Sequence, residues 1–148
     1  MKEIKYIGFY NVNSATHHRA TSTPALNKMD YICDAITRAG YNVNLVSPSW
    51  FEDPINIAPF KATSISQLNP NLKLTLTPSF GTSNKITAFF KIILSLSWLF
   101  FWLIINVKRG EKILVYHSPW LSIPIRWARK IKKFKLLRQF AVARVIIN

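Results

Sequence analysis

Histidine, serine and arginine side chains are concentrated in two stretches that each follow an apolar run of this sequence. The first is the glycine-free loop Asn11–Thr23, and the second is His117–Trp120. Histidine can act as a general base near neutral pH and arginine binds anions, so both stretches fit the rim of a cleft for an anionic or hydroxyl-rich ligand. Together with the end of an intervening strand they supply the candidate cleft residues, which are Asn13, His17, His18, Arg19, Ser49, His117 and Ser118.

Each candidate also has a plainer interpretation. Any one polar residue of the first loop can be an ordinary solvated side chain, because most loop residues carry no function. His117 can be a core histidine bonded to the backbone, or simply an exposed strand end. A metal site built from His17, His18 and His117 is not favoured, since adjacent histidines point apart and no carboxylate pattern offers a fourth ligand. No metal is therefore expected, and the spacing indicates no Ser/His/Asp triad.

Glycine-rich phosphate-binding motifs are missing from the chain, which holds only four glycines. A dinucleotide-binding turn requires GxGxxG and a P-loop requires GxxxxGK[ST], because the backbone must approach the phosphates closely. Their absence argues against a stand-alone Rossmann oxidoreductase or a P-loop enzyme, and no cofactor is expected. The single cysteine, Cys33, is expected in the core and excludes an internal disulfide framework.

The elements that must position these residues begin with a β-α-β pattern. Lys5–Tyr10 is a short apolar and aromatic run that is typical of a strand. Ser22 and Pro24 predict the start of a helix, and Gly40 predicts its end. Residues 41–49 then predict a second strand. A unit of this length is typical of a parallel, right-handed crossover.

The rest of the chain predicts a hairpin, further strands and two more helices. Residues 63–80 predict the hairpin, with Asn69-Pro70-Asn71 at its turn. Residues 112–118 predict a buried strand, and Pro119–Lys133 predicts a helix. This order indicates an α/β fold, with a Rossmann-like, mostly parallel sheet, flanking helices and a β-hairpin. In such sheets ligands bind beyond the carboxyl ends of the strands, so we expect three segments to meet there, residues 11–23, 47–50 and 117–120.

An apolar helix predicted at residues 86–107 has two interpretations. Its central part, Ala88–Ile105, has the length and composition of a membrane span, with a single charge at Lys91. Its tryptophans, Trp98 and Trp102, lie near the middle rather than at the ends, unlike an aromatic belt. A span would also place the two strand sets on opposite sides of the membrane. We therefore favour a helix that packs on the sheet or lies half-inserted at the membrane surface.

The net charge of +14 is concentrated in the second part of the chain. Residues 86–148 hold twelve basic residues and one acidic residue, Glu111, and the run Arg126–Lys135 holds six basic residues. Basic residues beside aromatic ones suit anionic lipid headgroups, although the same composition suits nucleic-acid phosphates or an ordinary solvated helix face. The neighbouring apolar helix favours the membrane. The membrane-surface candidates are Trp98, Trp102, Arg126, Arg129, Lys130, Lys132 and Lys133.

Residues 5–50 combine a strand, a polar loop, a helix, a glycine and a strand that ends in Ser-Pro. This order resembles the opening of bacterial GT-B glycosyltransferases of the family 4 type. NKMDYI at Asn27–Ile32 and GYNVNLVSPS at Gly40–Ser49 are similar to a polysaccharide-cluster subgroup. KILVYHSPW at Lys112–Trp120 resembles the later strand whose end lines the cleft of the amino-terminal domain. The resemblance covers residues 4–135.

The resemblance implies that residues 1–135 form an acceptor-side, Rossmann-like domain that binds a sugar or a lipid-linked acceptor. It also implies that the nucleotide-sugar donor is held mainly by a second domain, with a basic residue and a pair of acidic residues, which this chain does not contain. The family continues after this point with an acidic Glu-x-x-Glu segment, whereas residues 136–148 hold no acidic residue. We therefore expect a truncated, incomplete GT-B amino-terminal domain with an atypical tail at 136–148, inactive by itself.

These expectations give three hypotheses of different classes. The first is the acceptor-binding portion of a glycosyltransferase of the hexosyltransferase type, cytoplasmic and peripheral at the inner membrane face, for synthesis of bacterial surface polysaccharide. The second is a small basic membrane-associated interaction protein without enzymatic activity. The third, ranked last because no recognition motif is visible, is a nucleic-acid binder.

Overall fold

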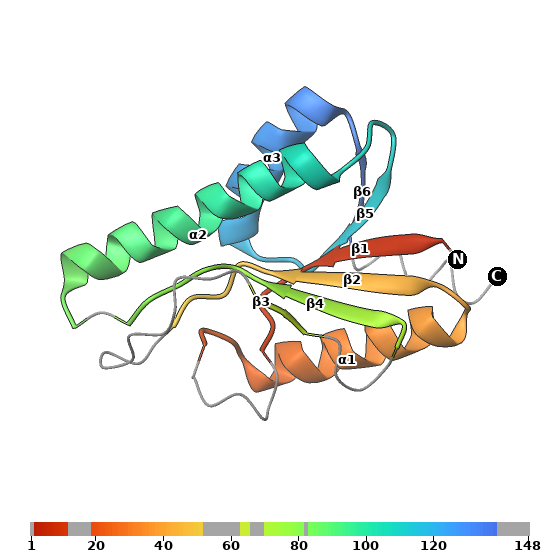
Figure 1. Ribbon diagram of the computed structural model, residues 1–148, viewed down its shortest axis with the longest axis horizontal. Helices are drawn as coiled ribbons and strands as arrows, with labels where there is room; N and C mark the ends of the chain where they lie inside the picture. The colour runs from red at the N-terminus through yellow and green to blue at the C-terminus, as the bar shows by residue number, and fades with distance from the viewer. Residues whose placement is uncertain (1, 12–18, 52–62, 66–69, 82, 139–148) are drawn as a thin grey trace.

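A six-stranded sheet with helices on both faces forms the protein (Figure 1). The computed structural model describes residues 2–11, 19–51, 63–65, 70–81 and 83–138. In chain order the elements are β1 (Glu3–Ile7), α1 (Thr23–Arg38), β2 (Asn42–Ser47), β3 (Thr63–Ile65), β4 (Leu72–Leu76), α2 (Lys85–Asn106), β5 (Lys112–Val115), α3 (Pro119–Lys132) and β6 (Lys135–Arg138).

The strand order is β3-β4-β2-β1-β5-β6, and every neighbouring pair is parallel except β3 with β4. Tyr6 of β1 is in register with Leu45 of β2 on one side and with Leu114 of β5 on the other. The predicted Rossmann-like, mostly parallel α/β fold is therefore confirmed. β3 also runs antiparallel to β4 at the edge of the sheet, as the predicted hairpin requires, while Asn69 of its predicted turn lies outside the described residues.

The first strand lies earlier in the chain than the sequence predicts. It spans Glu3–Ile7 instead of Lys5–Tyr10. Gly8 still donates to the carbonyl of Val46, but Tyr10 has already left the sheet, and its backbone N–H bonds the Ser47 hydroxyl. The apolar, aromatic run in the sequence is therefore longer than the strand, and its last residues belong to the loop at the carboxyl edge of the sheet.

Helix α1 covers one face of the sheet. Its buried residues Met29, Ile32, Cys33 and Ile36 recur at helical spacing and pack on side chains of β1, β2, β4 and β5. Pro24 lies in the first turn, where a missing N–H leaves no bond unmade. Gly40 follows the helix with φ of +84°, a conformation that glycine adopts without strain.

Helices α2 and α3 lie side by side on the opposite face (Figure 1). Leu99 and Leu103 of α2 and Leu121 and Ile125 of α3 form one buried cluster with side chains of β1, β2 and β5. The sheet is therefore the middle layer of three. Parallel sheets require this arrangement, since both of their faces are apolar.

Helix α2 packs through only a narrow stripe. By length and composition alone, α2 could cross a membrane. Within its most apolar stretch, 22% of the residues are buried. The preceding strand β4 and the following strand β5 belong to the same sheet, so α2 returns the chain across that sheet. Most of its apolar surface consequently faces outward.

Because α2 packs on the sheet through one side only, substitutions on its two sides should change the free energy of unfolding by different amounts. Leu103 is fully buried, whereas Ile105 is 77% exposed. We expect Leu103→Ala to lower the free energy of unfolding by about 2–5 kcal/mol, because a cavity replaces the lost side-chain atoms. The matched variant Ile105→Ala should change it by no more than about 0.5 kcal/mol. Urea denaturation followed by circular dichroism measures both, and equal losses would contradict this packing.

The buried cysteine of α1 gives a second prediction. Burial raises the pKa of the Cys33 thiol from its ordinary value of 9.0 to about 12, with a smaller contribution from the charge of Asp30. The thiolate is the reactive form, so folded protein at pH 8 should react with Ellman's reagent at least about a hundredfold more slowly than protein in urea.

The same shift makes stability depend on pH. Since the folded pKa of Cys33 is raised, its contribution to stability is present below pH 9 and is lost as the pH rises toward 12. In the labelling experiment, a reaction of Ellman's reagent with folded protein as fast as with protein in urea would contradict burial of the Cys33 thiol.

Candidate functional site

A cleft of about 290 Å³ opens at the carboxyl edge of the sheet, where β1 and β5 lie next to each other. From β1 the chain moves to β2 on one side and later to β5 on the other, so the strand order reverses at this point. Ligands of open parallel sheets bind at such reversals. The cleft is lined by Phe9, Ala20, Thr21, Ser22, Ala25, Trp50, Tyr116, His117, Ser118, Pro119 and Trp120.

Aromatic rings form much of its wall. The rings of Phe9 and Trp50 meet edge to face with 5.3 Å between their centroids, and those of Trp50 and Trp120 do so at 6.3 Å. Each ring follows a different strand, β1, β2 or β5. The edge-to-face geometry fixes one ring against the next and leaves apolar ring surface available in the cleft.

Two helices begin at the cleft. Ser22 is the N-cap of α1 and Ser118 is the N-cap of α3, and neither side chain caps its own helix. The first backbone N–H groups of a helix have no partner within it, and they favour oxygen atoms that carry partial or full negative charge. These ends add to the polar groups of the cleft, alongside Thr21 and His117, and can orient a ligand.

A serine network beneath the cleft fixes the loop after β1 to the end of β2. The Ser47 hydroxyl accepts from the Tyr10 N–H at 2.8 Å and donates to the Tyr10 carbonyl at 2.7 Å. The Ser49 hydroxyl lies 2.9 Å from it and also bonds the Tyr10 carbonyl, at 3.1 Å. Ser49, a predicted cleft residue, is fully buried, so its hydroxyl supports the loops and does not line the cleft.

Arg19 also lies beneath the cleft. Its guanidinium donates to the carbonyls of Ser49 at 2.6 Å and Thr77 at 3.1 Å, and it stacks on the Phe51 ring at 4.5 Å. Burial lowers the pKa of Arg19 to about 10. The side chain that the sequence placed at the ligand-facing rim therefore joins the loops after β1, β2 and β4.

The structure brings together parts of the three segments that were expected to meet. Ala20–Ser22, Trp50 and His117–Trp120 all line the cleft, with His117 exposed and Ser118 half-buried. Among the described residues, no group of three His, Cys, Asp or Glu side chains could hold a metal ion. Three further candidates, Asn13, His17 and His18, lie outside the described part of the chain.

Trp50 and Trp120 lie in segments that were expected to meet at the cleft, but neither was among the candidate cleft residues. Phe9 was expected inside the first strand, and it reaches the cleft because β1 ends at Ile7. The aromatic residue types in these segments were the signal for the wall of the cleft.

The membrane-surface candidates divide into two groups. Trp98 and Trp102 are half-buried against the cluster that joins α2 and α3 to the sheet. Most of the candidates in α3 and at its C-cap instead face solvent, and the exposed Trp127 lies between them with the Lys130 ammonium 5.8 Å from its ring centroid. The basic candidates are Arg126, Arg129, Lys130 and Lys133, which are exposed, and Lys132, which is half-buried.

Comparison with known proteins assigns no family. No protein-family model matches the chain, and no curated protein matches it.

Because the guanidinium of Arg19 is buried, replacing this residue should lower stability more than replacing an exposed arginine. We expect Arg19→Met to lower the free energy of unfolding by about 1–3 kcal/mol, because it leaves the carbonyls of Ser49 and Thr77 buried without a donor. The control Arg38→Met removes an exposed i,i+4 ion pair with Asp34 and should cost no more than about 0.5 kcal/mol. Thermal and urea denaturation of both variants measure the difference, and a stable Arg19→Met protein would show that Arg19 is not a structural anchor.

Proposed function

We propose that this chain is the acceptor-side domain of a GT-B-type glycosyltransferase that uses a nucleotide-sugar donor in bacterial surface polysaccharide synthesis. The observation that supports it most is the aromatic cleft at the strand-order reversal of a Rossmann-like sheet. The resemblance of residues 4–135 to the family 4 type supports the same assignment.

The chemistry of the cleft suits a sugar. A pyranose ring presents C–H groups on its faces and hydroxyl groups around its edge. The rings of Trp50 and Trp120 offer flat apolar surface for the faces, while Thr21, Ser22 and His117 offer polar groups for the hydroxyls. Pockets that combine apolar walls with a few placed polar groups are typical of small-molecule sites.

Within this proposal the residues have separate roles. Trp50 and Trp120 hold the acceptor sugar, and the two helix ends at Ser22 and Ser118 orient its oxygen atoms. His117 lies at the rim, where an imidazole can accept the proton of the acceptor hydroxyl as that oxygen bonds the donor sugar and the sugar–phosphate bond breaks, which releases the nucleotide. The resemblance assigns the donor to a second domain, so the described residues contribute the acceptor side of the site.

A membrane-associated interaction protein without enzymatic activity is the second candidate. The exposed apolar residues of α2 and α3 favour it, since a soluble enzyme domain does not need them. Binding of a sugar in the cleft separates the two candidates, because an interaction protein has no use for a sugar site.

The test is binding of soluble oligosaccharides, measured by saturation-transfer NMR and titration calorimetry in the absence of lipid. We expect Trp120→Ala to weaken binding at least about tenfold, because the variant removes an aromatic wall of the cleft. Trp127→Ala is the matched control, since Trp127 is another exposed tryptophan of α3 and lies outside this cleft.

Two results would refute the proposal. One is the absence of sugar binding across a panel of hexoses, amino sugars and their short oligosaccharides. The other is binding that Trp120→Ala and Trp127→Ala weaken alike, which would place the sugar elsewhere.

A further inference from the structure

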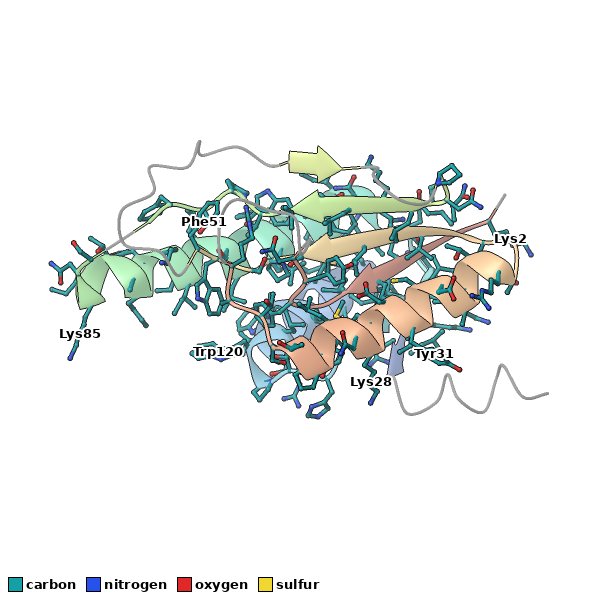
Figure 2. The ribbon with its side chains drawn as sticks, turned by 90° about the horizontal axis from the view of Figure 1, so that it is seen from below. Lys2, Lys28, Tyr31, Phe51, Lys85 and Trp120 are labelled. Atoms are coloured by element: carbon teal, nitrogen blue, oxygen red, sulfur yellow. The ribbon has the colours of Figure 1, made fainter. Side chains whose placement is uncertain are left out.

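Helix α2 is longer than the sheet on which it packs. Its 22 residues span about 33 Å, whereas the five or six residues of β1 and β2 span about 17–20 Å. The amino-terminal part of α2 therefore extends past the carboxyl ends of the strands, as Figure 1 shows. In Figure 2, Lys85 at the start of α2 lies at the same end of the molecule as Phe51 and Trp120, and Lys2 lies at the opposite end.

The outward side of α2 is mostly apolar, although Thr87 and Ser97 are also exposed. On the extended part, Ile86, Phe89 and Phe90 are each more than 60% exposed. A groove of about 360 Å³ between α2 and α3, lined in part by Phe101 and Trp127, continues this surface onto α3. We call this surface the docking face; its exposed apolar residues are Ile86, Phe89, Phe90, Ile93, Phe101 and Ile105 of α2 and Ile123, Trp127 and Ile131 of α3.

Basic residues border the docking face. The exposed Arg126, Arg129 and Lys130 alternate along α3 with Trp127 and Ile131. Neither α2 nor α3 contains an acidic residue. The salt bridges found among the described residues lie elsewhere, on β1 with the turn before β5 and on α1, so nothing in that part of the chain neutralises the charges of α3.

We propose that the docking face lies in the plane of an anionic lipid bilayer, with α2 and α3 inserted into one leaflet. Such a surface offers hydrocarbon to the exposed phenylalanines and phosphate groups to the flanking arginines and lysines. A second copy of the chain fits the face less well, because a symmetric contact would bring its basic residues near those of its partner. A nucleic acid would contact the basic residues but leave the apolar ones in water.

The fold favours insertion parallel to the membrane over a span. Strands β4 and β5 flank α2 in the chain and belong to one sheet, which has to stay on one side. Lys91 of α2 also donates from its ammonium to the Phe51 carbonyl, at 2.5 Å, which ties the extended part of the helix to the loop after β2. The helix can therefore enter the leaflet only as far as its outward face allows.

Docking in this orientation has a consequence for the cleft. Trp120 lines the cleft and lies in the first turn of the helix that carries Trp127, and the extended part of α2 lies at the same end of the sheet. The cleft mouth is thereby held at the bilayer surface, which selects a lipid-linked acceptor. This last step rests on the proposed acceptor cleft, whereas the docking itself does not.

Vesicle co-sedimentation of the full chain tests the docking without any sugar. The vesicles are phosphatidylcholine alone or an equal mixture with phosphatidylglycerol. We expect binding to the mixed vesicles and at least about a tenfold weakening in the double variant Phe89→Ser with Phe90→Ser, which removes two inserted rings. The control Tyr31→Ser replaces an aromatic residue of α1 that is 75% exposed on the other face, and it should bind as the unchanged chain does.

A second pair of variants tests the basic residues of α3. Both variants lose the same number of positive charges, so they differ only in where the charges are removed. Arg126→Gln with Lys130→Gln should weaken binding to the mixed vesicles about tenfold or more, since each basic contact with an anionic surface contributes about 1 kcal/mol. Lys2→Gln with Lys28→Gln removes the same charge from the residue before β1 and from α1, and its effect should be much smaller. Circular dichroism of every variant shows that the fold is kept.

Labelling decides between insertion in one leaflet and a span. Ser83→Cys and Lys108→Cys place thiols at the two ends of α2, and the native Cys33 is buried. An impermeant maleimide added outside docked vesicles should label both positions. Labelling of one end only, failure to bind mixed vesicles, equal effects of Phe89/Phe90 and Tyr31 variants, or a dimer that does not bind vesicles would each overturn the proposal. Loss of sugar binding alone would not.

Discussion

Parallel pairing of β1 on both of its edges is the constraint on which the rest of the structure depends. Through it the chain before α2, represented by β2, and the chain after α2, represented by β5, become neighbours of one buried strand. Such a strand buries apolar side chains on both faces, Tyr6 on one and Ile7 on the other, which places α1 on one side and α2 with α3 on the other. The same pairing creates the strand-order reversal at which the cleft opens.

Support for the cleft comes from hydrogen bonds that lie beneath it. Ser47, Ser49 and Arg19 join the loops after β1, β2 and β4 by bonds to backbone carbonyls. Because these groups are buried and partnered, the aromatic rings above them are held by a rigid base. The cleft therefore separates two tasks: polar side chains position the loops, and aromatic side chains with helix ends contact the ligand.

Local sequence patterns were sufficient for the topology but not for the direction of individual side chains. Helical spacing, proline and glycine signals and the Asn-Pro-Asn turn predicted the β-α-β unit and the hairpin because each depends on nearby residues. Arg19 could not be placed in this way, since its partners lie 30 and 58 residues away. Ser49 was expected to line the cleft, and its burial could not be predicted either, because its hydroxyl bonds the carbonyl of Tyr10, a residue distant in the sequence. Likewise, α2 is apolar all round, so no periodicity shows which side faces the sheet.

The orientation of α2 on the sheet is not the one expected for a helix whose outer side faces water. The side that it buries along its first turns contains Lys91 and Ser95, while Phe89 and Phe90 face outward. The Ser95 hydroxyl is buried and has no hydrogen-bond partner among the described residues, which carries a desolvation cost. An ordinary surface helix would turn such residues the other way. The arrangement becomes favourable when the outward side meets hydrocarbon, because each ring then leaves water while the ammonium of Lys91 keeps its carbonyl partner inside the domain.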